Sequence, residues 1–144
     1  MILGFSDINS LALTILGALC FAILNKTPPR YLAHTTSIAC VPRLIQGMIP
    51  GTWYPTLTTF VSSLTVACLA HLVARQTAKP AQTFLIPGVI YLLPGIAIYR
   101  AFALGLGKEI ESATALGLSA MSTAWAISFG ILLANWVVPS RRTL

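Results

Sequence analysis

Charged side chains are scarce in this sequence of 144 residues. Only 8% of the residues are Asp, Glu, Lys or Arg, whereas an ordinary soluble domain carries about 25%. So few charges cannot cover the surface of a soluble globule, and they are too dispersed to line a nucleic-acid groove. Because hydrophobic residues make up 56% of the chain, the composition predicts an all-α integral membrane protein.

The residues that enzymes and metal sites need are also missing. The sequence has three acidic residues, Asp7, Glu109 and Glu111, and no paired carboxylates, Ser-His-Asp set or phosphate loop. Its three cysteines stand apart without C-x-x-C spacing, which excludes a disulfide framework and a zinc site. His34 and His71 are single imidazoles that fit either a proton relay or a polar tip on an apolar helix. We therefore expect no enzymatic activity, no metal and no cofactor.

Long apolar segments divide the chain into predicted membrane spans. A hydrocarbon core about 30 Å thick needs about 20 apolar residues per helix, so the chain has room for about five spans in a single domain. The second segment contains His34, Arg43 and Gln46, so hydropathy alone would also fit a loop or a surface helix. No basic residue precedes the first apolar run, so we expect that helix to be retained rather than cleaved. The predicted transmembrane domain covers residues 1–144, with spans at 8–24, 31–49, 53–74, 81–106 and 113–138.

The basic residues decide between four spans and five. If residues 31–49 do not cross, the charged loops divide four against four and carry no orientation signal. If they do cross, one side collects six basic residues and the other keeps only Lys108, a strong positive-inside pattern. This pattern predicts five spans, with the N-terminus outside and the C-terminus inside. The basic residues of the predicted inner side are Lys26, Arg30, Arg75, Lys79, Arg141 and Arg142.

Small residues recur at helix-packing spacing in the first and last predicted spans. Such stripes let helix backbones approach closely. They fit ordinary packing within the bundle, or the docking of a second protein on one stripe. The stripes are Ser10, Thr14, Ala18 and Ala22 in the first span, and Ala120, Ala124 and Ser128 with Ala126, Gly130 and Ala134 in the last.

Two Pro-Gly pairs, Pro87-Gly88 and Pro94-Gly95, lie seven residues apart in the fourth predicted span. Each proline removes a backbone donor and clashes with the preceding turn, while each glycine permits dihedral angles closed to other residues. We expect both pairs to break the helix, rather than only to shape the bundle as kinks. Freed backbone groups in a bilayer need protein or water to satisfy them, so a broken helix indicates a cavity near the midplane. The N-terminus of a half-helix there would attract an anionic group such as a carboxylate.

Two arginines, Arg43 and Arg100, fall within or near the predicted membrane. An arginine stays charged, and burying it is costly unless it is paired or hydrated. Arg100 either snorkels to the outer surface or contacts a substrate or gate. Both arginines could instead pair with the carboxylates predicted on the outer side, Asp7, Glu109 and Glu111. The two glutamates also precede the last helix, where the helix dipole favours acidic residues.

Residues 93–100, Leu-Pro-Gly-Ile-Ala-Ile-Tyr-Arg, form the most distinctive motif of the chain, with Pro87-Gly88 upstream. In this motif, in the loop from Asn25 to Arg30 and in Arg43, the chain resembles the small subunit of the split threonine/serine exporter (ThrE) family. Members of that family tend to carry the pattern P-G-x-x-P-x-x-P-G. Here Tyr91 stands in place of the middle proline.

The resemblance implies a five-helix membrane module that pairs with a larger membrane subunit to form one exporter. Related pairs export threonine and serine, or dicarboxylates such as succinate, driven by ion or proton gradients across the bacterial cytoplasmic (inner) membrane. All these substrates carry a carboxylate, in agreement with the independent argument from the arginines and the broken helix. The residues predicted to line the pathway or to contact substrate are Pro87, Gly88, Pro94, Gly95, Tyr99, Arg100 and Arg43.

Other interpretations belong to other classes of protein. A non-transporting membrane scaffold would use the small-residue stripes for assembly and the Pro-Gly pairs only for shape, and a homo-oligomer would also fit the stripes. A stand-alone small drug exporter is disfavoured, because such proteins need a carboxylate within the membrane and the predicted spans contain none. We therefore expect an exporter subunit in the lipid bilayer, with no nucleic-acid partner.

Overall fold

The computed structural model describes residues 5–48 and 55–138, and every regular element in this part of the chain is a helix. The elements in chain order are α1 (Phe5–Leu24), η1 (Pro29–Tyr31), α2 (Leu32–Met48), α3 (Pro55–Thr77), α4 (Gln82–Val89), η2 (Ile90–Leu92), α5 (Gly95–Leu106) and α6 (Ile110–Val137). The prediction of an all-helical protein is confirmed for these residues.

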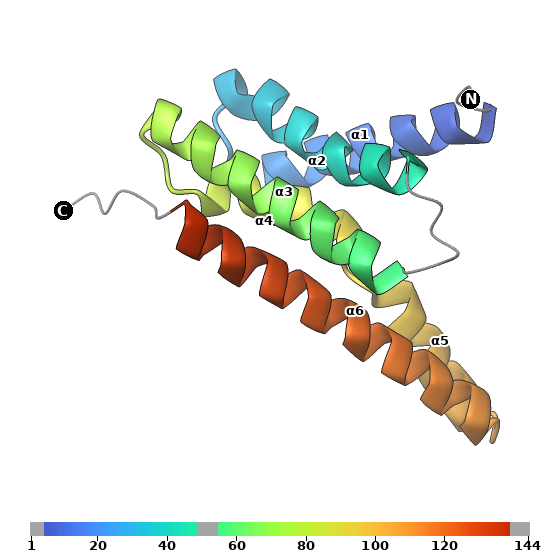
Figure 1. The fold of residues 1–144 in the computed structure, drawn as a ribbon. Helices are drawn as coiled ribbons and strands as arrows, with labels where there is room; N and C mark the ends of the chain where they lie inside the picture. The colour runs from blue at the N-terminus through green and yellow to red at the C-terminus, as the bar shows by residue number, and fades with distance from the viewer. Residues whose placement is uncertain (1–4, 49–54, 139–144) are drawn as a thin grey trace.

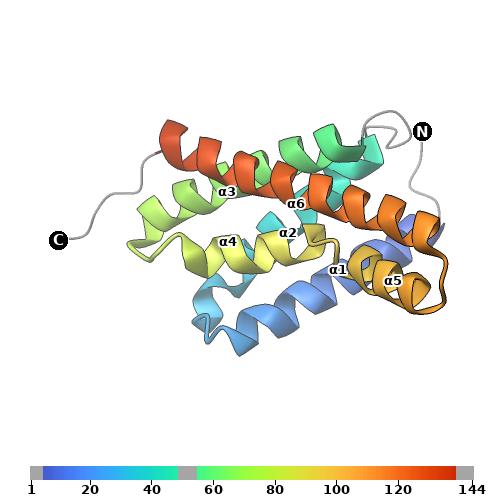
Figure 2. The same cartoon turned by 90° about the horizontal axis from the view of Figure 1, so that it is seen from below.

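Most of the helices pack together in what we call the body, which consists of α1, α2, α3, α4 with η2, and residues 125–137 of α6. Helix α2 contacts α1, α3 and α4, and α3 also packs along α6 (Figure 1). Seen from below, α4 lies among α1, α2, α3 and α6 (Figure 2). The segment that carries the first Pro-Gly pair therefore packs against α1, α2 and α3, while Ile86 stays exposed.

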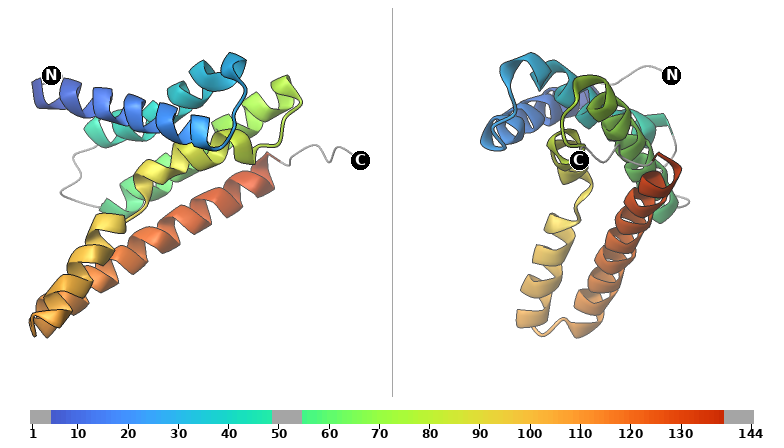
Figure 3. Two further views of the ribbon diagram at one scale, coloured as in Figure 1. Left: turned by 180° about the vertical axis from the view of Figure 1, so that it is seen from behind. Right: turned by 90° about the vertical axis from the view of Figure 1, so that its left-hand side faces the viewer.

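The remaining two helical pieces project from the body as what we call the arm. The arm is α5 together with residues 110–124 of α6, and these two pieces pack against each other. Figure 3 shows the pair leaving the body like a hairpin, with the α5–α6 connection at its tip. Helix α6 has 28 residues and a length of about 42 Å, so it is long enough to form part of both the body and the arm.

The core of the body is built around Phe84, which is fully buried. Its ring meets the ring of Tyr31 edge-on at 6.0 Å between centroids. Small and β-branched residues of α3 fill the space beside it, because apolar helices approach closely only where side chains are short. The buried cluster comprises Ile38, Val66, Ala70, Ala74, Phe84, Val89, Leu92 and Ile127.

Helices α3 and α6 approach each other most closely at Gly130. A Cβ atom there would collide with Ser63 Oγ and lie 3.0 Å from both Leu64 N and Phe60 O. Ala126 and Ala134, one turn to either side of Gly130, are also buried. This stripe of the last predicted span therefore serves packing within the chain, not the docking of a second protein.

In residues 5–48 and 55–138, three helices end in a residue with left-handed backbone conformation: Lys26 after α1, Ala78 after α3 and Lys108 after α5. In each case the following amide reaches back to the last turn, as in Thr27 N to Ala22 O at 3.0 Å and Glu109 N to Leu104 O at 3.0 Å. This is the Schellman arrangement, which satisfies carbonyls that the helix itself cannot. It sets sharp chain reversals at both ends of the molecule.

Helices occupy all five predicted spans, but length and composition qualify only some of them for crossing a membrane. Within the described residues, α3 and α6 qualify singly, and α4–η2 qualifies together with α5 as one bent pair. The apolar part of α1, Leu11–Leu24, is shorter. The structure therefore supports a multi-pass membrane protein with two or three candidate spans. Residues 1–4, 49–54 and 139–144 lie outside the described part, and with them Arg141, Arg142 and the adjoining ends of the second and third predicted spans.

The two Pro-Gly pairs behave differently from each other. At the first pair, Pro87 and Gly88 both lie within α4, which ends at Val89 and is followed directly by the short 3-10 helix η2. A Cβ atom on Gly88 would lie 2.7 Å from Val66 Cγ1 and 3.1 Å from Ile38 Cγ2. The expected break at this pair is therefore not confirmed, since both residues lie within α4 and contacts from α2 and α3 pack against Gly88. The interruption lies at the second pair.

Candidate functional site

The interruption between η2 and α5 is a tight turn centred on Pro94. This residue has φ −79° and ψ 42°, and Gly95 N donates to Leu93 O at 2.9 Å. These values describe an inverse γ-turn. The helical pieces on either side, Gln82–Leu92 and Gly95–Leu106, are bent by 43° relative to each other. The second Pro-Gly pair thus stands where the chain leaves the body and enters the arm.

A cavity of about 430 Å³ lies beside the first Pro-Gly pair, between α1, α2 and α4 with η2. Its size falls in the range of small-molecule sites. The wall is mainly apolar, with hydroxyl groups supplied by Thr14 and Tyr91. The lining residues are Leu13, Thr14, Gly17, Ala18, Phe21, Ala39, Pro87, Ile90 and Tyr91.

Arg43 lies next to this cavity and contacts one of its lining residues, Tyr91. Arg43 Nη1 donates a hydrogen bond to Tyr91 Oη at 3.4 Å, and the arginine is half-buried on α2. Tyr91 is therefore the link between the predicted arginine and the pocket that Pro87 lines. The guanidinium of Arg43 can present planar donors to a carboxylate that enters there.

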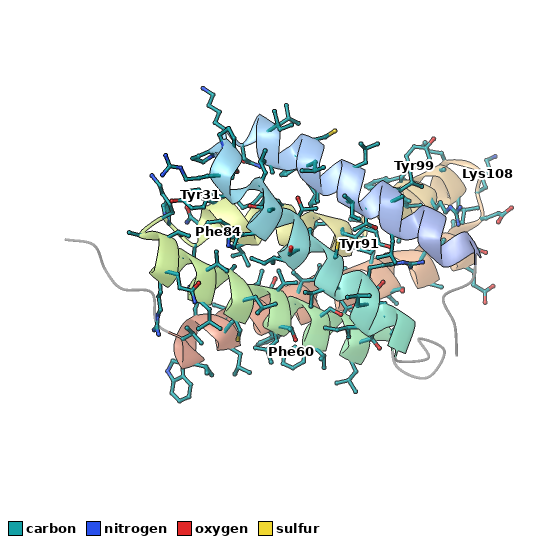
Figure 4. All side chains as sticks on the ribbon, turned by 90° about the horizontal axis from the view of Figure 1, so that it is seen from above. Tyr31, Phe60, Phe84, Tyr91, Tyr99 and Lys108 are labelled. Atoms are coloured by element: carbon teal, nitrogen blue, oxygen red, sulfur yellow. The ribbon has the colours of Figure 1, made fainter. Side chains whose placement is uncertain are left out.

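Tyr99 and Arg100 lie elsewhere, on the exposed surface of α5. Tyr99 is 74% exposed. Figure 4 shows Tyr91 near the middle of the molecule, and Tyr99 toward the end that carries Lys108. Among the described residues the side chain of Arg100 forms no hydrogen bond and no ion pair with Glu109 or Glu111. The predicted residues thus divide into an inner group around Arg43 and Pro87 and an outer group on the arm.

Glu109 and Glu111 stand at the start of α6, as their predicted dipole role requires. Glu109 occupies the N-cap position and Glu111 lies in the first turn, and the Glu109 side chain makes no capping hydrogen bond. Their contribution is therefore electrostatic, through the positive end of the helix dipole. The third carboxylate, Asp7, lies in α1, and its side chain is outside the described part of the structure.

A row of buried polar residues along α3 was not anticipated from the sequence. Ser62 and Ser63 are fully buried, Thr58 and Thr59 are buried one turn earlier, and His71 is 5% exposed. The sequence signal is a hydroxyl residue at every third or fourth position of an apolar segment. The mean hydropathy of the segment stays high despite these hydroxyl residues, so a hydropathy profile does not reveal the row.

His71 joins α3 to α6 near one end of the body. Its Nε2 lies 2.6 Å from Asn135 Oδ1, while its Nδ1 is buried without a hydrogen-bond partner among the described residues. A hydrogen bond between helices is a common device for holding membrane helices together. No group of three His, Cys, Asp or Glu side chains in the described part of the chain could hold a metal ion.

Comparisons with known proteins decide the family. A family model described as the threonine/serine exporter ThrE matches residues 10–137, which is most of the chain. The chain belongs to the threonine/serine exporter family. The resemblance seen in the Pro-Gly motif is therefore confirmed, and the family is one of membrane exporters rather than enzymes.

A probable threonine/serine exporter from Mycobacterium tuberculosis is 26% identical over 129 residues. The alignment covers 88% of this chain and 24% of that relative, so the chain spans about a quarter of the relative's length. No solved structure matches the chain.

Proposed function

We propose that this chain is a membrane subunit of a secondary exporter for small metabolites that carry a carboxylate. In this proposal the substrate is threonine or serine, or a dicarboxylate such as succinate, and a larger membrane subunit completes the transporter. Family membership supports the transport role. The residue roles rest on the geometry of the inner cavity and of the arm.

The observation that carries the proposal is the hydrogen bond from Arg43 to Tyr91 at the cavity between α1, α2 and α4. A charged donor beside a mainly apolar cavity of about 430 Å³ suits a small anionic group with a short apolar part. An arginine within a membrane span is costly to bury and is taken by default as part of a functional site. Arg43 therefore takes the substrate carboxylate, and Tyr91 positions the guanidinium.

The distribution of basic residues supports the predicted orientation in the bacterial cytoplasmic membrane. The loops that carry Lys26, Arg30 and Lys79 lie at one end of the body, whereas Lys108 lies at the tip of the arm (Figure 1). The first end then faces the cytoplasm under the positive-inside rule. The five predicted spans and the outward N-terminus remain part of this proposal.

A larger partner is proposed because the chain corresponds to about a quarter of its Mycobacterium tuberculosis relative. Helix α5 has 12 residues and a length of about 18 Å, too short to cross a bilayer alone. The exposed Tyr99 and Arg100 then face the partner, where Arg100 forms the outer part of the substrate path. Pro94 and Gly95 provide the bend that joins the two parts of this path.

The test is efflux of threonine, serine and succinate from bacterial cells that express this chain alone, the larger partner alone, or both. Efflux only with both subunits is the expected result, and it identifies the substrate. Arg100→Gln and Pro94→Ala should each lower efflux while leaving membrane insertion intact. If the complex assembles but exports none of the three compounds, the proposed function is wrong for these substrates.

A non-transporting scaffold is the second candidate, favoured by one observation on the arm. An apolar groove of about 480 Å³ lies between α5 and α6, lined by residues such as Ala101, Gly117 and Ala124. A scaffold that docks a partner helix there would tolerate Arg43→Gln and Arg100→Gln. It would lose complex formation on Ala124→Leu. Efflux and co-purification of these variants therefore separate the two functions.

A further inference from the structure

Exposed basic side chains gather at one end of the body. They come from the connection between α1 and α2, which includes η1, and from the last turn of α3 with the connection that follows it. Both connections and the C-terminal end of α6 lie at this end of the molecule (Figures 1 and 2). We call it the basic face, and its residues are Lys26, Arg30, Arg75 and Lys79, all exposed.

Contacts within the chain hold the parts of the basic face in fixed positions. The ring of Tyr31 in η1 meets the ring of Phe84 in α4 at 6.0 Å between centroids. Arg30 Cζ lies 5.9 Å from the centroid of the Tyr31 ring. The hydrogen bond between His71 and Asn135 joins the last turns of α3 to those of α6. The basic groups therefore stand on packed helix ends rather than on a separate tail.

The ends of the candidate membrane spans place the basic face at a membrane surface. Helices α3 and α6 are candidate spans that end here, at Thr77 and Val137, and the bent pair of α4–η2 and α5 begins here at Gln82. Residues 78–81 therefore join two candidate spans. Trp136, beside the end of α6, is 84% exposed. Tryptophan is enriched where membrane helices reach the headgroup level, which agrees with this placement.

The acidic residues of the chain stand away from the basic face. Glu109 and Glu111 stand at the start of α6, at the tip of the arm (Figure 3). Asp7 lies in the first turn of α1, at the end of that helix remote from Lys26. Helices α2 and α4 begin at the basic face, and neither has an acidic residue in its first turn. The charge of the basic face is therefore not balanced by Asp or Glu residues of the described chain.

The chemistry of the basic face suits phosphate groups at a membrane surface. A surface that contains anionic lipids has a negative potential, which attracts basic residues next to membrane spans. Ammonium and guanidinium groups also form charge-assisted hydrogen bonds with phosphate oxygens. We propose that the basic face binds the headgroups of anionic phospholipids, with Lys26, Arg30 and Lys79 as the phosphate contacts. This interaction does not depend on the exported substrate.

The experiment measures thermal unfolding of the purified full-length chain in detergent. Phosphatidylglycerol, which is anionic, is added in one arm, and phosphatidylcholine with the same acyl chains, which has no net charge, in the other. A ligand that binds only the folded protein raises the unfolding temperature. We expect phosphatidylglycerol to give the half-maximal rise at a concentration at least about fivefold lower, the factor for one basic contact with an anionic surface. Inorganic phosphate, in a third arm, should cause no comparable rise.

Lys26→Gln is the decisive variant, and Lys108→Gln is its matched control. Both lysines are exposed, and both follow a helix C-terminus in left-handed backbone conformation. They differ in position, because Lys108 lies at the tip of the arm beside Glu109. We expect Lys26→Gln to weaken the apparent affinity for phosphatidylglycerol about fivefold, and Lys108→Gln to leave it unchanged. Replacing Lys26, Arg30 and Lys79 together by glutamine should abolish the preference for the anionic lipid.

Salt provides a second measurement that needs no variant. Screening at 1 M sodium chloride should reduce the preference of the wild-type chain for phosphatidylglycerol. Equal responses to the two lipids, a preference that salt does not reduce, or equal losses in Lys26→Gln and Lys108→Gln would refute the lipid site. A rise with inorganic phosphate as large as that with phosphatidylglycerol would assign the face to a soluble anion instead. No substrate is present in these measurements, so a failure of efflux overturns the proposed function and leaves the lipid site standing.

Discussion

The body and the arm of this chain use small residues in opposite ways. In the body, Gly130 brings α6 so close to α3 that even one methyl group would meet backbone atoms. In the arm, a methyl group added to Gly117 on the same helix would meet no neighbouring atom within 4 Å, and this glycine lines an open groove. The same helix thus has one glycine, Gly130, in close contact with another helix and one, Gly117, at an open groove.

The difference shows that a stripe of small residues does not by itself identify an interface. Both stretches of α6 have the spacing that lets helices approach closely. The C-terminal stretch packs closely on α3 at Gly130, whereas the N-terminal stretch packs on α5 and leaves an open groove at Gly117.

The largest effect is expected from Gly130→Leu. The side chain would collide with Ser63 Oγ and press on Leu64 N and Phe60 O, which belong to helix backbone and cannot move cheaply. We expect a loss of stability of at least about 3 kcal/mol, at the upper end for overpacking. Thermal unfolding of the detergent-purified chain measures it. Gly117→Leu on the arm is the control, and equal losses for both would contradict the division into body and arm.

The effect of Arg43→Gln tests whether substrate is bound by the inner group around Arg43 or by the outer group around Arg100 on the arm. Removing the charge at the cavity should lower efflux about tenfold or more, in line with loss of a charged hydrogen bond. Arg43→Lys should recover part of the activity, since it keeps the charge without the planar fork. The measurement is initial efflux rate per inserted transporter. An unchanged rate for Arg43→Gln, beside a reduced one for Arg100→Gln, would move the substrate site from the body to the arm.

Gly88→Ala and Gly95→Ala compare the two Pro-Gly pairs. At Gly88 the new methyl would lie 2.7 Å from Val66 Cγ1, so we expect destabilisation of about 1–2 kcal/mol as the valine side chain shifts. At Gly95 the methyl would meet no neighbouring atom within 4 Å, and alanine should stabilise the chain by about 0.4–1 kcal/mol through the unfolded state. Chemical unfolding curves give both values. Destabilisation at Gly95 instead would show that this glycine packs against something in the assembled protein.

The smallest effect is expected from Tyr91→Phe, which deletes only the hydroxyl that accepts from Arg43. Losing one hydrogen bond of about 1 kcal/mol should lower efflux about fivefold and leave folding intact. The readout is the concentration of substrate that gives half-maximal efflux. A Tyr91→Phe variant as damaging as Arg43→Gln would mean that the tyrosine touches substrate itself.

The helices were predictable from the sequence because their signals are local. Long apolar segments and the scarcity of charge predicted the spans that α1, α3 and α6 occupy. The helix at Arg43 was harder, since its polar residues resemble those of a loop, and only the balance of basic residues favoured it. The break at Pro94 followed from backbone chemistry, but the intact helix at Pro87 did not.

The candidate site was predictable only in part. Arg43 and Pro87 stand out in the sequence for their charge and their backbone effect, and the structure places Tyr91 between them at one cavity. In the sequence, Tyr91 is distinctive only as a departure from the family's proline pattern. Ser62 was not predicted, because hydropathy averages over the hydroxyl residues of an apolar span, and its lack of a partner among the described residues is visible only in three dimensions.

The sequence by itself determined that this chain is helical, apolar and a member of an exporter family, because composition, hydropathy and a Pro-Gly motif are properties of short segments. Tertiary structure decided the rest. It decided that Gly88 packs while Pro94 bends the chain, that Arg43 meets Tyr91, and that Arg100 stays exposed. These outcomes depend on which helices lie beside each residue, and contacts between segments far apart in the chain leave no local pattern.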